Sequence, residues 1–345
     1  MLHAPMLNKH PHADGCIDVH CHVVPLDLPA DPSGGALPLW PQMHCDDGQL
    51  ATFVAGTTRR KFDDRSWFAS RRIDYMNQHG IALQVLSPLP ELLGYWFEPA
   101  ATALLCRHTN NALEKMVEAS PDRFTALGGL PMNDIGLSID EARRLKTMGF
   151  AGVELGSNVN GISPADARYN DLWAALNELD LAVFVHGLRP ATDGRLIGPE
   201  ALAPIVGIPM DTALCVASFI ASGLLDRLPG LRIGFSHGGG GLGAVIDRFE
   251  HVWKVMPELQ QRLPRSPLQE ARRFYYDILT FSTEYTRYLL QKLGPECLFI
   301  GTDFPAGGMG LMDPVKFVQD LGLSPTERDQ VMRNTAMRFL NLRDP

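Results

Sequence analysis

Histidine and aspartate residues stand at the ends of apolar runs that lie far apart in the sequence. The runs cover 17–22, 181–186, 231–237 and 297–303, and they carry His20 and His22, His186, His237 and Asp303. Side chains two apart on a β-strand point to the same face, so His20 and His22 would project together. Imidazole nitrogens and a carboxylate oxygen are the donors that zinc or a similar divalent metal takes in a catalytic site. The pattern therefore predicts a metal-dependent enzyme.

The five residues divide into two roles. The imidazoles of His20, His22 and His186 and the carboxylate of Asp303 could surround one ion and leave a position for water. A divalent metal lowers the pKa of bound water to about 7, which supplies hydroxide at neutral pH. His237 follows a different strand, and we assign it to general acid–base catalysis.

An alternation of apolar strands and amphipathic helices predicts the elements that position these residues. Eight candidate strands are 17–22, 81–87, 124–130, 150–155, 181–186, 231–237, 274–280 and 297–302. Helices are expected at 67–79, 98–119, 138–148, 169–179, 209–227 and 242–255. Eight βα units favour a closed (β/α)₈ TIM barrel, with a doubly wound open sheet as the alternative. In such a barrel, catalytic groups lie at the carboxyl ends of the strands.

Three segments depart from this alternation. Residues 1–15 read as a leader, and 16–345 as a single barrel domain. Residues 23–66 begin with many prolines and glycines, and we expect an insertion over the barrel mouth with short strands near 37–40 and 50–54. At the other end, Ser324 to Glu327 form a helix start signal, so 326–340 should be a closing helix.

Composition narrows the class of protein. The net charge is -8, and no basic block exceeds the triplet at 59–61, which argues against nucleic acid as a partner. The six cysteines form no CxxC pair and read as free thiols in a reducing compartment. We find neither a signal-peptide pattern nor a run of eighteen apolar residues. We therefore expect a cytoplasmic enzyme with no membrane span.

With these residues in view, the chain resembles the amidohydrolase superfamily, and within it the aminocarboxymuconate-semialdehyde decarboxylase branch. The resemblance runs from residue 17 to residue 340. The segments that carry it are DVHCH at 18–22, LSPLP at 86–90, GYW at 94–96, LGGLPM at 127–132, FVH at 184–186, SHGGG at 236–240 and GTDFP at 301–305.

The resemblance implies His20, His22, His186 and Asp303 as ligands of one divalent metal, with Asp303 also counted as catalytic. It implies that His237 activates the metal-bound water. Imidazole-rich ligation favours zinc, while manganese or iron also suits such a set. Glu154 ends the fourth strand, where many amidohydrolases carry a carbamylated lysine, so a binuclear site is not expected. Glu154 is left open as a fifth ligand or as an acceptor for a ligand histidine.

Arginines would bind the anionic substrate. The resemblance implies Arg60 and Arg248 for this role, the second supplied across the interface of a homodimer. Their alternatives are a solvated charge at Arg60 and a helix-surface salt bridge at Arg248. Where the branch has Pro-Trp after the strand-five histidine, this chain has GLRP at 187–190, which adds Arg189 as a third candidate. Residues 306–308 read AGG where the branch has another aromatic, so the pocket is reshaped.

These inferences favour a metal-dependent, non-oxidative decarboxylase acting on a small unsaturated or aromatic carboxylate. Hydrolysis of a lactone or amide, or hydration of an unsaturated diacid, would use the same groups and is the alternative. A barrel kept as a non-catalytic metal-binding protein should lack one of the five residues, and none is missing.

Overall fold

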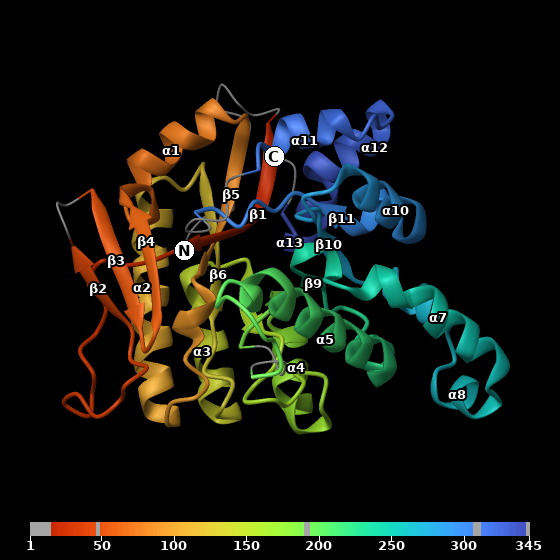
Figure 1. Cartoon of the computed structure of the whole chain (residues 1–345), viewed down its shortest axis with the longest axis horizontal. Coiled ribbons are helices and arrows are strands. Elements are labelled where there is room, and N and C mark those ends of the chain that lie inside the picture. Colours follow the sequence, from red (N-terminus) through yellow and green to blue (C-terminus); the bar gives the residue numbers. More distant parts are fainter. Residues whose placement is uncertain (1–14, 46–48, 190–193, 306–311, 343–345) are drawn as a thin grey trace.

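The computed structural model describes residues 15–45, 49–189, 194–305 and 312–342. Within them, eight strands form one parallel sheet in the order β1-β5-β6-β7-β8-β9-β10-β11 (Figure 1). These strands are β1 (Cys16–Val23), β5 (Ile81–Pro88), β6 (Phe124–Gly129), β7 (Gly152–Gly156), β8 (Ala182–His186), β9 (Ile233–Phe235), β10 (Tyr275–Asp277) and β11 (Leu298–Phe299). Each predicted strand is confirmed, although β9, β10 and β11 are shorter than predicted.

The two ends of the sheet meet. The chain after β11 returns to β1, where the amide of Val19 donates to the carbonyl of Ile300 at 2.9 Å. Two further bridges join β1 to this returning segment. The sheet is therefore a (β/α)₈ TIM barrel, as predicted, and the doubly wound alternative is wrong because an open sheet has two unpaired edges.

Helices cover the outer face of the barrel. They are α1 (Ala69–Gln78), α2 (Pro99–Ala119), α3 (Ile135–Met148), α4 (Asn170–Glu178), α5 (Ile208–Ser222), α6 (Leu224–Arg227), α7 (Leu242–Val255), α8 (Pro257–Arg262), α9 (Pro267–Ala271), α10 (Thr283–Leu293) and α11 (Pro314–Asp320). Local signals set their ends, as in α3, where the Asp134 side chain accepts from the amide of Leu137 and Gly149 ends the helix at a φ of 82°.

The closing helix seals the amino end of the barrel. Residues 325–340 form α12 (Pro325–Asp329), a π-helical turn (Gln330–Asn334) and α13 (Thr335–Leu340). The predicted start signal is confirmed, since Ser324 and Glu327 cap each other reciprocally. The ring of Phe339 on α13 lies 5.2 Å from that of Phe299, inside the barrel. Because apolar side chains fill this end, the carboxyl end is left for a site.

The insertion after β1 is a three-stranded antiparallel sheet of β2 (Gln42–Cys45), β3 (Leu50–Ala55) and β4 (Thr58–Asp63). Phe53 and Phe62 belong to a buried cluster with residues at the start of α2, and the sheet lies beside α2 (Figure 1). The strand predicted near 50–54 is confirmed. The one predicted at 37–40 is wrong, because Pro38 and Pro41 bring no amide hydrogen to a ladder.

One helical run raises the question of a membrane. Ala203–Ser222 is long and apolar enough to span a bilayer by length and composition, with a mean hydropathy of 1.7. In the barrel, α5 packs against α7 and α9. The core helices of soluble proteins share this composition, so the expectation of no membrane span stays a prediction. Of the predicted leader, only Gly15 lies within the described residues, and residues 190 and 306–308 lie outside them.

Candidate metal centre

Four side chains converge at the carboxyl end of the barrel. His20, His22, His186 and Asp303 are all buried, and each offers a donor atom within 4.8 Å of the other three. The Nε2 atoms of His20 and His22 are 3.2 Å apart, and Asp303 Oδ1 lies 2.9 Å from the second and 3.5 Å from the first. Tetrahedral ligands about 2.0 Å from a zinc ion lie about 3.3 Å from one another. The spacing therefore fits one small cation.

Barrel closure brings the first and last strands of this group together. His20 and His22 lie on β1, and the amide of Asp303 donates to the carbonyl of His20 at 2.8 Å. Between the two histidines, Cys21 points away into the core between the sheet and the helices, where its thiol contacts the carbonyl of Val85. The predicted alternation along this strand is therefore observed at the site.

The other ring nitrogen of each histidine is fixed by a neighbour. Nδ1 of His20 lies 2.7 Å from Asp277 Oδ2, and Nδ1 of His22 lies 2.9 Å from the carbonyl of Pro88. In His186, Nδ1 lies 2.7 Å from the carbonyl of Gly187. These acceptors require a proton on Nδ1, which leaves the Nε2 lone pairs for the centre.

His186 provides an independent test of the fit. Its Nε2 atom is buried, and among the described residues it has no hydrogen-bond partner. A buried polar atom without a partner is costly, and a cation held by the neighbouring donors would satisfy it. The residues present therefore fit a divalent metal with three imidazoles and one carboxylate.

Electrostatics prepares the carboxylate for ligation. Burial alone would raise the pKa of Asp303, but before a metal binds, the close contact with His22 and the charges of the neighbouring histidines hold that pKa well below its usual range. Burial opposes the charged form of His20, yet Asp277 and Asp303 raise the pKa of His20 to about 9. Burial and the neighbouring histidines lower the pKa of His186 well below its ordinary value. Asp303 is thus an anion and His186 a neutral donor.

His237 stands beside this group. Its ring centroid lies 5.1 Å from that of His186 and 5.4 Å from that of His20. His237 is half-buried as a residue, and its Nδ1 atom is buried and has no hydrogen-bond partner among the described residues. Burial lowers the pKa of His237 below its ordinary value. Its φ of 56° is left-handed, and a side chain at Gly240 would meet the carbonyl of Pro209 at 1.8 Å. The glycine run therefore allows a sharp turn that presents a neutral imidazole.

Asp277 was missed by the sequence reasoning. It is fully buried at the end of β10, and besides His20 it accepts from the amides of Gly238 at 2.9 Å and Leu279 at 3.0 Å. Its sequence signal was present, because an acidic residue interrupts the apolar run at 274–279. The same signal drew attention to the other strand ends.

Glu154 lies beside the centre but outside the four converging donors. It is fully buried on β7, and neither carboxyl oxygen has a hydrogen-bond partner among the described residues. Its nearer oxygen lies 3.9 Å from Nδ1 of His22, beyond hydrogen-bond distance, and that nitrogen already faces Pro88. Burial raises the pKa of Glu154.

Two of the three predicted arginines meet the segment that follows β5. Arg60 on β4 places Nη1 2.8 Å from Glu91 Oε1, and the charges of Glu91 and Asp303 raise the pKa of Arg60. The guanidinium of Arg189 lies 4.0 Å from the ring centroid of Trp96. Glu91 and Trp96 both belong to this one segment, and neither was singled out as a partner from the sequence.

Arg248 lies elsewhere. It is exposed on α7, and no contact within the described part of the chain joins it to the residues of the metal centre. The helix itself extends away from the barrel (Figure 1). A role for Arg248 at a site of its own chain is therefore not supported.

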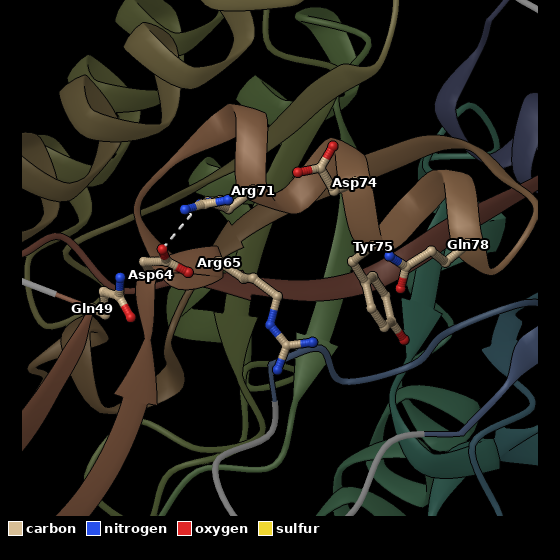
Figure 2. A pocket seen from close by; sticks show the side chains of 7 residues that line it. All are labelled: Gln49, Asp64, Arg65, Arg71, Asp74, Tyr75 and Gln78. Carbon is tan, nitrogen blue, oxygen red and sulfur yellow. Dashed lines mark hydrogen bonds and ion pairs between the residues drawn. The ribbon is translucent and has the colours of Figure 1, made fainter.

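A separate polar pocket of about 320 Å³ lies beside α1. It is lined by Gln49, Asp64, Arg65, Arg71, Asp74, Tyr75 and Gln78 (Figure 2). Arg71 and Asp64 form an ion pair at 3.2 Å across it. Arg65 and Tyr75 both contact the ring of Phe304, the residue after Asp303. The pocket thus adjoins the chain segment of the site without containing any of its donors.

Fold and site together define a TIM-barrel protein with a mononuclear His₃Asp metal centre at the carboxyl ends of its strands. Residues 17–342 match the profile of the amidohydrolase family, and the chain belongs to that family.

Named relatives are similar over most of the chain. A 2-amino-3-carboxymuconate-6-semialdehyde decarboxylase of Dictyostelium discoideum is 31% identical over 335 residues, which cover 95% of this chain and 92% of that protein. A gamma-resorcylate decarboxylase of Rhodococcus jostii is 29% identical over 79% of this chain and 87% of its own length. The crystal structure of a dihydroxybenzoic acid decarboxylase from a Polaromonas species, with bound manganese and 2-nitroresorcinol, has a TM-score of 0.74, 21% identity, and coverage of 95% and 97%.

Proposed function

We propose that this protein is a metal-dependent, non-oxidative decarboxylase of a small aromatic or unsaturated carboxylate. The observation that carries the proposal is the convergence of four metal donors beside a neutral imidazole, His237. The ring centroid of His237 lies 5.1 Å from that of His186, one of the four donors. This arrangement occurs in a chain whose relatives are named decarboxylases of such acids.

Substrate binding is assigned to cations at the mouth. Arg60 would bind the carboxylate or an adjacent anionic group, since its guanidinium is held by Glu91 and is near enough to Asp303 for that charge to raise its pKa. Arg189, held against Trp96, would contact a second polar substituent. Arginine suits this task because its planar fork matches a carboxylate with two hydrogen bonds.

The chemistry needs a proton and a place for an electron pair. A divalent metal held by His20, His22, His186 and Asp303 would supply a positive centre that stabilises negative charge on the bound substrate. As a neutral base, His237 would take a proton from an acidic group of the bound substrate or from water and pass it to the carbon that bears the leaving carboxylate. The C–C bond then breaks, CO₂ departs, and its electron pair restores the conjugated system with hydrogen in place of the carboxylate. The buried walls exclude water, which strengthens each electrostatic contact.

Zinc is the metal we assign, because imidazole-rich sets favour it, with manganese as the second candidate. The manganese of the Polaromonas enzyme supports this second possibility. Elemental analysis of protein purified without added metal, followed by activity after reconstitution with each ion, distinguishes the two.

We further propose a homodimer that brings Arg248 to the site of its partner. Its exposure on α7, together with exposed apolar side chains at Val245 and Val255 on the same helix, supports this assembly. Light scattering of the purified protein measures the mass. A monomer with full activity would exclude a role for Arg248 in catalysis.

Decarboxylation is tested by following carbon. The metal-loaded protein is incubated with 2,6-dihydroxybenzoate and with other small aromatic or unsaturated carboxylates, and CO₂ release is measured along with product mass. Decarboxylation removes 44 mass units, as elementary stoichiometry requires, whereas hydrolysis or hydration adds water and keeps every carbon. A product that retains all carbons would favour the hydrolytic alternative.

A further inference from the structure

One buried carboxylate contacts both functional parts of the site. Asp277 Oδ2 lies 2.7 Å from Nδ1 of His20. Its other oxygen, Oδ1, accepts from the amide of Gly238, the residue directly after His237, at 2.9 Å. The same oxygen accepts from the amide of Leu279 at 3.0 Å, which fixes the carboxylate on its own strand.

The contact with His20 determines which nitrogen faces the metal. A carboxylate at Nδ1 accepts a hydrogen bond, so the proton of the neutral ring stays on Nδ1 and the lone pair stays on Nε2. Nε2 is the atom that lies among the other donors. An anionic acceptor also makes the imidazole a stronger donor to a cation.

The contact with Gly238 acts on the acid–base residue. His237 has a φ of 56°, and the three residues after it also have positive φ values of 63°, 73° and 62°. A left-handed conformation is unfavourable for a histidine and persists only where its surroundings fix it. The hydrogen bond from Gly238 to Asp277 holds the peptide that leaves His237.

We propose that Asp277 is a positioning residue that sets the tautomer of His20 through one oxygen and the orientation of His237 through the other. It thereby couples the metal centre to the acid–base group. The inference rests on the proposed metal site, but it does not depend on which carboxylate is consumed.

Two substitutions separate the contact of Asp277 with His20, the first arm, from its contact with Gly238, the second arm. In Asp277→Asn, the amide oxygen still accepts from Gly238 and Leu279, while the amide nitrogen opposes Nδ1–H of His20. The donor–donor conflict favours the other tautomer, whose Nε2 carries a proton and cannot bind metal. Asp277→Ala removes both arms. Glu141→Gln is the matched control, because Glu141 is a buried carboxylate that bonds Asn110 and Arg144 among the outer helices.

The first arm is measured as Zn²⁺ affinity by competition with a chromophoric chelator, which requires no substrate. We expect affinity to fall about 10- to 100-fold in both Asp277 variants and to stay unchanged in the control. Wild-type affinity in Asp277→Asn would overturn the assignment of the His20 tautomer. Nitrogen-15 NMR of the zinc-loaded wild type adds a test without mutation, since Nδ1 of His20 should carry the proton.

The second arm is measured by the crystal structures of the zinc-loaded variants. His237 should keep its left-handed φ in Asp277→Asn and lose it in Asp277→Ala. At saturating zinc, turnover in the alanine variant should be at least about tenfold below that of the asparagine variant, in the range of losing a placed acid–base group. An unchanged His237 in Asp277→Ala would overturn this arm. If no variant or wild-type protein decarboxylates any acid, the proposed function fails, while the affinity and structural results still decide this inference.

Discussion

Glu91 Oε1 accepts a hydrogen bond from Arg60 Nη1 at 2.8 Å, and this ion pair joins the inserted sheet to the segment that follows the second barrel strand. The side chains are 22% and 27% exposed, so the pair lies at the edge of the mouth instead of in open solvent. Burial opposes the charged form of Arg60, but Glu91 and Asp303 together raise its pKa. Arg60 is therefore a cation held in place by Glu91 and influenced by the charge of Asp303.

We expect Arg60→Ala to lower kcat/KM about 10- to 100-fold, because a hydrogen bond to a charged group contributes about 1.5–3 kcal/mol. Glu91→Gln should raise KM by a smaller factor, since the guanidinium stays charged but loses its ionic support. Steady-state kinetics on the best substrate measures both. Arg60→Ala with wild-type kcat/KM would remove Arg60 from substrate binding.

Replacing His237 should abolish turnover and leave metal binding intact, because the donor set does not include it. Asn is the better substitution, since it tolerates the left-handed φ of 56° that alanine resists. We expect His237→Asn to lower kcat about 10²- to 10⁴-fold. Metal content by elemental analysis is the control. Full activity at wild-type metal content would show that another group manages the proton.

Arg189 should determine preference among substrates. Its guanidinium lies over Trp96, at the mouth, where it would meet a substituent remote from the leaving carboxylate. We expect Arg189→Ala to raise KM about three- to tenfold for a substrate with a second acidic group, from an interaction of about 1 kcal/mol. The KM of a monocarboxylate should change little. Arg168→Ala, which removes an exposed arginine paired with Asp166, is the control.

Glu154 predicts a pH-dependent difference in stability. Burial raises its pKa in the folded protein, so the folded state keeps a proton that the unfolded chain releases. The contribution of Glu154 to the free energy of unfolding is therefore present below the ordinary pKa of a glutamic acid and is lost as pH rises above it. Glu154→Gln lacks this titration.

Denaturant unfolding of the metal-free proteins checks this prediction. Between about pH 5 and pH 8, the free energy of unfolding of Glu154→Gln should fall less than that of the wild type. The two proteins should bind zinc equally, because Glu154 is not among the converging donors. Parallel pH profiles for the two proteins would contradict a raised pKa in the folded state.

The barrel and its ligand residues could be predicted because the barrel strands are apolar runs, and the strands that supply ligands are followed by a polar residue at their carboxyl ends. This local pattern gives both the strand and the edge at which His186 or Asp303 must lie. The insertion was harder. Its strand β4 consists of exposed or half-exposed polar residues with one buried apolar residue, Phe62. The strand forms because Phe53 and Phe62 pack in one cluster with residues of α2, and such a long-range contact leaves no local signal in the sequence.

Partners across the barrel were also beyond reach of the sequence. Trp96 and Arg189 lie on different loops, and only the closed barrel brings their side chains together. Asp277 carried a signal, but its link to His20 spans 257 positions. The position of Glu154, 3.9 Å from Nδ1 of His22, depends on side-chain placement that residue types do not encode.

The hydrogen bond from Asp303 to His20 has a consequence for how the protein matures. The donors of one cation come from both the first and the last strand of the barrel, and the cylinder is joined at that seam. During synthesis, a chain whose last barrel strand is still in the ribosome has its three histidine ligands but lacks Asp303. Tight binding of the metal ion should therefore occur late in folding, after the last strand has joined β1. The bound ion should then stabilise the closed barrel against separation of the first and last strands.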